Sequence, residues 1–99
     1  MSYLKLSKRA TQGRLLEYAN YEDGSFINLI ELDRPYKDGT RYSVHETTKS
    51  PFCSCGIFKD HETARRKFNL MVLNGAFESK LIETGVREGE KFKTVKNEN

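Results

Sequence analysis

The sequence contains no tryptophan, only two cysteines and two prolines, and no long apolar run. A helix that crosses a bilayer needs about 20 consecutive apolar residues, and no stretch of this chain approaches that length. Residues 1–9 are interrupted by lysines, so they lack the continuous apolar segment of a secretory signal peptide. We therefore expect a cytoplasmic protein that does not enter a membrane.

Common catalytic signatures are also missing. There is no Gly-x-Ser-x-Gly, no glycine-rich phosphate loop and no acidic cluster suited to metal-assisted hydrolysis. Neighbouring acids such as Glu31 and Asp33 are typical of solvated turns. A domain of about four segments also offers no obvious deep cleft. These absences predict a protein that is not an enzyme and that needs no cofactor.

The two cysteines, Cys53 and Cys55, are separated by one residue, which strains any disulfide between them. His45 and His61 flank them, and Zn²⁺ binds such sets of four ligands tetrahedrally. The spacing His-x7-Cys-x-Cys-x5-His departs from the usual Cys-x2–4-Cys of structural zinc sites. The favoured interpretation is therefore no metal site, with strand cysteines and surface histidines, and zinc binding is the alternative.

Ninety-nine residues suffice for one domain and leave no room for a second core. Asp23-Gly24 and Asp38-Gly39 are typical hairpin turns, and they separate predicted strands at residues 15–19, 26–32 and 41–47. A shorter extended segment follows at 53–58. The sequence predicts an α+β fold, in which an antiparallel meander of three to four strands is followed by one packed helix.

The predicted helix begins after Asp60, a suitable N-cap, and Gly75 is well placed to end it. One stripe along it is apolar, which predicts packing against the sheet, and Leu70 and Leu73 broaden this stripe. Its members are Ala64, Phe68, Met71 and Val72.

The domain is expected to span residues 13–84, after a polar segment at 1–12 and before a flexible tail at 85–99. Around residues 77–82 the pattern allows a short helix or another strand, and a brief strand is also possible at 92–95.

The strand at residues 26–32 is apolar on both of its alternating faces. One face carries Phe26, Ile30 and Leu32, and the other carries Ile27 and Leu29. One helix covers only one face of a small sheet, so the second face needs another cover. The alternatives are the segment at 77–82 or another protein chain, which includes a homodimer.

A formal net charge of +3 is too small to indicate nucleic-acid binding by itself. However, basic and aromatic residues alternate on the predicted strands and turns, a combination that suits nucleic acid. The alternative is that the tyrosines pack and the arginines confer solubility. The candidate nucleic-acid contacts are Arg14, Lys37, Arg41, Tyr42, Lys8 and Arg9.

Gly56, Phe58, Ala64 and Phe68 mark a strand that turns into a packed helix. This junction, with the meander before it, resembles two related DNA-binding domains: the plant ethylene-response-type domain and the arm-site-binding domain of phage integrases. The resemblance implies a three-stranded sheet that contacts DNA through basic and aromatic strand residues. It would give that role to Arg14, Arg41 and Lys37 among the residues named above.

Two classes of function follow. The favoured one is a small non-catalytic module that binds nucleic acid through its sheet. The alternative is a protein-interaction module, such as a small regulator or inhibitor of the phage or mobile-element type, that acts through an apolar sheet face.

Overall fold

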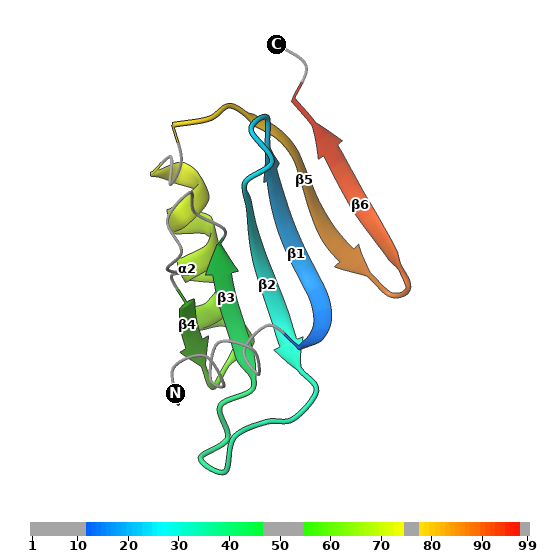
Figure 1. Ribbon diagram of the computed structural model, residues 1–99. Helices are drawn as coiled ribbons and strands as arrows, with labels where there is room; N and C mark the ends of the chain where they lie inside the picture. Colours follow the sequence, from blue (N-terminus) through cyan, green and yellow to red (C-terminus); the bar gives the residue numbers. More distant parts are fainter. Residues whose placement is uncertain (1–11, 47–54, 75–77, 98–99) are drawn as a thin grey trace.

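The structure is a computed structural model that describes residues 12–46, 55–74 and 78–97. Within these residues the chain forms six strands and one helix. The six strands make one antiparallel sheet in the order β4-β3-β2-β1-β5-β6 (Figure 1). The elements are β1 (Gly13–Tyr21), β2 (Phe26–Leu32), β3 (Tyr42–Glu46), β4 (Cys55–Phe58), α2 (His61–Leu73), β5 (Leu81–Glu88) and β6 (Lys91–Lys96).

The prediction of an α+β fold with an antiparallel meander and a packed helix is confirmed, but the sheet is larger than expected. Strands β1 to β4 form the meander. The chain then returns through α2, and β5 pairs with the free side of β1. Strand β1, which the meander prediction places at an edge, is therefore in the interior of the sheet.

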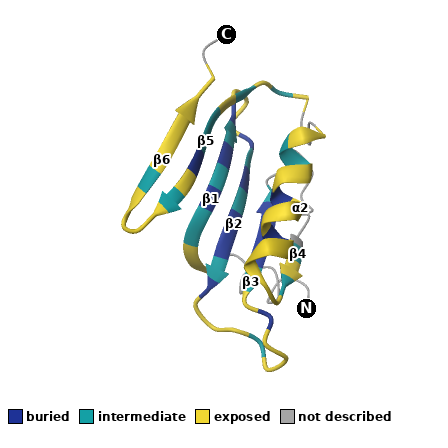
Figure 2. Cartoon of the chain, turned by 180° about the vertical axis from the view of Figure 1, so that it is seen from behind, coloured by how far each residue is buried: buried dark blue, intermediate teal, exposed yellow. Residues whose placement is uncertain are grey.

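Helix α2 packs on one face of the sheet, here called the helix side, and it contacts β2, β3 and β4. The opposite face is called the second face. Because the helix is confined to one half of the sheet, β5 and β6 carry no helix on the helix side (Figure 2). This uncovered half is where the candidate site lies.

The predicted Asp-Gly turns are both present. Gly24 and Gly39 have φ values of 90° and 92°, a left-handed conformation that glycine adopts without strain. In each turn the aspartate side chain accepts a backbone hydrogen bond two residues on, from Ser25 to Asp23 and from Thr40 to Asp38, both at 2.9 Å. Local turn chemistry thus fixes the first two hairpins of the meander, β1–β2 and β2–β3.

Helix α2 begins as predicted. The carboxylate of Asp60 accepts a hydrogen bond from the backbone N–H of Thr63 at 2.8 Å, so it caps the first turn. Gly75, the predicted end, lies outside the described residues. The expectation that Leu70 and Leu73 broaden the buried stripe is wrong, because they are 55% and 80% exposed.

The core lies between α2 and the meander. Alternate residues of β1, β2 and β3 point toward the helix and are almost fully buried there. Partly buried residues, among them Met71 and Val72, surround this cluster. The buried cluster consists of Ala19, Tyr21, Ile27, Leu29, Val44, Ala64 and Phe68.

Part of the second face, over β2 and β3, is buried within the single chain. Ile30 and Leu32 are each 5% exposed, and Ser43 and His45 beside them are also buried. The expectation that residues 77–82 cover this face is wrong for Leu81 and Ile82, because they belong to β5, in the plane of the sheet. Neither Ile30 nor Leu32 therefore requires a partner chain.

The C-terminal part of the chain is a hairpin of β5 and β6. The expected boundary between residues 84 and 85 therefore falls inside β5. Gly85 pairs with Tyr18, and a Cβ at position 85 would overlap the Tyr18 ring. This glycine permits close approach of an aromatic side chain across the strands, rather than marking a flexible tail.

Within the described residues, no helix has the length and apolar character that crossing a membrane requires.

Candidate functional site

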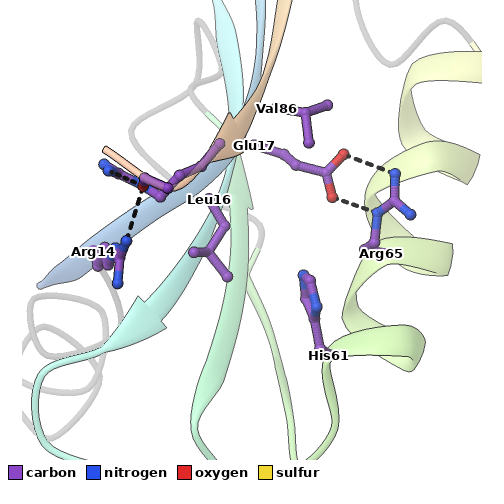
Figure 3. A pocket seen from close by; sticks show the side chains of 8 residues that line it. Arg14, Leu16, Glu17, His61, Arg65 and Val86 are labelled. Atoms are coloured by element: carbon purple, nitrogen blue, oxygen red, sulfur yellow. Dashed lines mark hydrogen bonds and ion pairs between the residues drawn. The ribbon is translucent and has the colours of Figure 1, made fainter. Parts of the chain in front are cut away.

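A pocket of about 360 Å³ lies on the helix side, in the half of the sheet that α2 leaves uncovered. It is bounded by the first turns of α2, the beginning of β1 and the β5–β6 turn (Figure 3). Five of its eight lining residues have polar or charged side chains, and two have apolar side chains. The lining residues are Arg14, Leu16, Glu17, His61, Arg65, Val86, Arg87 and Gly89.

A β-bulge in β1 shapes one wall of the pocket. The register against β2 shifts between Leu15 and Glu17, which makes Leu16 the extra residue. Neighbouring strand residues normally point to opposite faces, but here both Leu16 and Glu17 line the pocket. The bulge thus places an apolar side chain and a carboxylate side by side.

Glu17 is a buried carboxylate, with only 3% of the residue exposed. It accepts two hydrogen bonds from Arg65 on α2, from Nε at 2.6 Å and from Nη2 at 3.4 Å. The hydrogen bonds and charge of Glu17 raise the pKa of the Arg65 guanidinium. A buried charge requires such a partner, so Glu17 holds Arg65 at the pocket and joins the helix to β1.

Arg14 and Arg87 converge on one carbonyl oxygen. Arg14 Nη2 donates to Gly89 O at 3.0 Å and Arg87 Nη1 donates to the same oxygen at 3.3 Å. Arg87 Nε also donates to the carbonyl of Leu15, at 2.7 Å. Within the described residues, neither guanidinium forms an ion pair with a carboxylate. The Arg87 guanidinium also lies over the Phe92 ring, with Cζ 4.7 Å from the ring centroid. Two positive charges therefore meet at the pocket, and their hydrogen-bond partners among the described residues are backbone carbonyls.

His61, the first residue of α2, contributes an aromatic ring to the pocket. Its ring stacks on Tyr42 of β3, with centroids 5.3 Å apart and planes 23° apart. Tyr42, predicted as a nucleic-acid contact, is not among the lining residues. It instead supports the imidazole that lines the pocket.

The other predicted nucleic-acid contacts are scattered. Arg14 lines the pocket, whereas Lys37 and Arg41 are exposed in the connection between β2 and β3 and do not reach it. Lys8 and Arg9 lie outside the described residues. The structure thus brings Arg14 and Tyr42 into one neighbourhood and leaves Lys37 and Arg41 apart from it.

The zinc candidates do not form one site. His45 lies on the second face, where its ring contacts Phe26, and His61 lies on the helix side, so the sheet separates them. Cys55 pairs with His45 across β3 and β4, while Cys53 lies outside the described residues. In the described part of the chain, no three His, Cys, Asp or Glu residues are grouped as metal ligands.

Sequence reasoning missed most of the site. Glu17 interrupts an apolar run, and a charged residue at a strand position that is expected to be buried is the sequence feature that could have identified it. The sequence predicts a flexible tail at residues 85–99, and this prediction gives no sign that Arg87 and Gly89 lie beside Arg14. Their approach depends on pairing between β1 and β5, which local patterns do not reveal.

Comparisons with family models, curated proteins and solved structures found no match to this chain. The resemblance to ethylene-response-type and integrase arm-binding domains therefore stays a prediction. Arg14 pairs with Glu31 and Glu31 pairs with Tyr42, so all three share the helix side. Any contact that Arg14 makes with nucleic acid would thus be on the same face as α2.

Proposed function

We propose that this protein is a small non-catalytic module that binds nucleic acid, with the phosphate backbone held by Arg14 and Arg87 at the mouth of the pocket. The observation that carries the proposal is the convergence of these two guanidinium groups on Gly89 O, with no carboxylate partner in the part of the chain that the structure describes. Each guanidinium has five N–H donors, so donors remain for an anion. Arginine is well suited to phosphate oxygens, because it can donate two parallel hydrogen bonds.

Exposed lysines extend the positive surface beyond the pocket. Lys93 pairs with Val86, a lining residue, so both side chains are on the helix side of the hairpin. Lys91 lies two residues earlier on the same strand and has the same orientation. Lysines also protect an edge strand from unwanted pairing, and β6 is such an edge. A phosphate backbone that enters at Arg14 would run along these lysines.

Fluorescence anisotropy with labelled single-stranded and duplex oligonucleotides at low salt tests the proposal. The double variant Arg14→Ala/Arg87→Ala is compared with Lys37→Ala/Arg41→Ala, which removes the same amount of charge from a surface away from the pocket. We expect wild-type binding in the micromolar range, a loss of about tenfold or more in the first variant, and little change in the second. No binding by the wild type, or a larger loss in the Lys37/Arg41 variant, would overturn it.

A second candidate function is protein interaction, and one observation favours it. Leu70 and Leu73 are 55% and 80% exposed on consecutive turns of α2. Large exposed apolar side chains that are neighbours on one helix face are typical of contact surfaces. If this surface forms a homodimer, light scattering coupled to size exclusion should give twice the monomer mass, and Leu70→Ser/Leu73→Ser should restore the monomer. A monomeric wild type would exclude a homodimer.

A further inference from the structure

We infer that the pocket accepts a single nucleotide of a single-stranded nucleic acid, with its phosphate at Arg14 and Arg87 and its base between Leu16, Val86 and His61. This inference rests on the proposed function and specifies its ligand. The pocket volume of about 360 Å³ falls in the range of small-molecule sites, so the pocket is more than a point of contact for one phosphate group.

The two ends of the pocket differ in chemistry. At the β5–β6 turn, Arg14 and Arg87 retain N–H donors that Gly89 O and Leu15 O do not use. A phosphate there would place negative charge beside two positive charges that otherwise repel each other. This end therefore suits the charged part of a nucleotide.

The wall opposite is apolar and aromatic. Leu16 and Val86 come from the neighbouring strands β1 and β5, and His61 comes from α2 (Figure 3). The His61 ring is held by its stack on Tyr42. Aliphatic side chains and a fixed ring are the surfaces on which a flat base packs. This arrangement distinguishes a nucleotide from an inorganic anion, which gains nothing from apolar walls.

The Glu17–Arg65 pair adds hydrogen-bonding groups to the same pocket. Arg65 uses Nε and Nη2 for Glu17, which leaves Nη1 without a hydrogen bond among the described residues. Its side chain is 48% exposed, so this nitrogen can reach a ligand. Base edges present acceptors and donors that such a pair can contact. The pair is thus placed to orient a base once it has entered.

The position of these groups in a pocket favours single strands. In a duplex the bases are stacked and paired, so one must be unstacked before it can enter a side-chain pocket. A single strand requires no unpairing. We therefore expect the pocket to be occupied by single-stranded ligands, with duplex DNA limited to contacts with its backbone.

NMR titration of the ¹⁵N-labelled full chain tests the inference with three probes: adenosine 5′-monophosphate, inorganic phosphate and a single-stranded oligonucleotide. We expect the nucleotide and the oligonucleotide to shift the same amide signals, including those of Leu16, Val86 and Gly89. We expect the nucleotide to bind about tenfold more tightly than inorganic phosphate, because the stacked base adds to the phosphate contact.

Variants separate the two ends of the pocket. His61→Ala should weaken nucleotide binding about tenfold and leave phosphate binding unchanged. His61→Phe keeps an aromatic ring at this position and should therefore retain nucleotide binding. Arg14→Ala/Arg87→Ala should weaken the binding of both the nucleotide and inorganic phosphate. Arg66→Ala serves as the control, because Arg66 is exposed, pairs with Glu62 and does not line the pocket.

The possible failures are distinguishable. Oligonucleotide binding without shifts at the pocket, or equal affinities for nucleotide and phosphate, would overturn the inference and leave the proposed function standing. A duplex that binds as tightly as a single strand and shifts the same pocket signals would also overturn it. No binding of any oligonucleotide would overturn both.

Discussion

Arg65 of α2 donates two hydrogen bonds to the buried carboxylate of Glu17 on β1, at 2.6 and 3.4 Å. The two residues are 48 positions apart in the sequence, and their pairing fixes the helix relative to the strand that begins the chain's described part. Glu17 is buried while Arg65 is half exposed. Loss of the pair would therefore leave the Glu17 charge unpaired in the interior, whereas the Arg65 charge would still be in contact with solvent.

Arg65→Ala should destabilise the fold strongly, because it leaves the buried Glu17 carboxylate without its partner. Breaking a buried pair costs about 3–5 kcal/mol, and the exposure of Arg65 reduces the expected loss to about 2–3 kcal/mol. Urea unfolding measures the change. The matched control is Arg66→Ala, whose exposed pair with Glu62 should contribute less than about 1 kcal/mol. Equal effects of the two substitutions would show that Glu17 does not require Arg65.

His45 should make stability depend on pH. Burial lowers its pKa from the ordinary value of 6.5, so the unfolded chain binds a proton before the folded one does. Stability should be highest above pH 6.5 and fall as the pH drops from there toward the folded-state pKa. Burial raises the pKa of the neighbouring Glu46, which acts in the opposite direction by favouring the folded state once that carboxyl is protonated.

Urea unfolding of wild type and His45→Gln between pH 7.5 and 5.5 isolates the histidine, because Glu46 is common to both proteins. The wild type should lose stability across this range, and the variant should show a smaller loss. If the free energy of unfolding changes with pH in parallel for the two proteins, His45 is not the source of the pH dependence.

Gly85 should not tolerate a side chain. A Cβ at this position would overlap the ring of Tyr18, whose hydroxyl contacts Glu83 and Thr94 across three strands. Gly85→Ala should cost about 2 kcal/mol, the usual scale of overpacking. In a protein that already carries Tyr18→Ala, Gly85→Ala should lower the free energy of unfolding much less. A double-mutant cycle by urea unfolding measures this coupling between the two positions. A coupling near zero would mean that the ring does not set the requirement for glycine.

The parts of the fold that could be predicted from the sequence are those set by neighbouring residues. Asp23-Gly24 and Asp38-Gly39 fix two turns, and Asp60 caps the helix through a residue three positions away. Ala64 and Phe68 are one turn apart on the helix and are both buried. Each of these features is encoded within a few residues, so a pattern search finds it.

The β5–β6 hairpin and the pocket could not be predicted in the same way. Strand β5 alternates weakly and contains Gly85, whose role appears only when Tyr18 lies across from it. Arg14 meets Gly89 across 75 positions of sequence. The sequence does predict that both faces of β2 are apolar, and both carry buried apolar residues. However, the sequence could not show that Ile30 is buried within the chain itself.

The measurement that tests the central claim most directly is the salt dependence of single-strand binding, compared between wild type and Arg14→Ala/Arg87→Ala. Each phosphate contact contributes about 0.7 to the slope of log affinity against log salt for single strands. The wild-type affinity should fall linearly on this plot, and the double variant should have a slope lower by about 0.7, because the two arginines hold one phosphate. Identical slopes for the two proteins would contradict the assignment of the phosphate contact to Arg14 and Arg87.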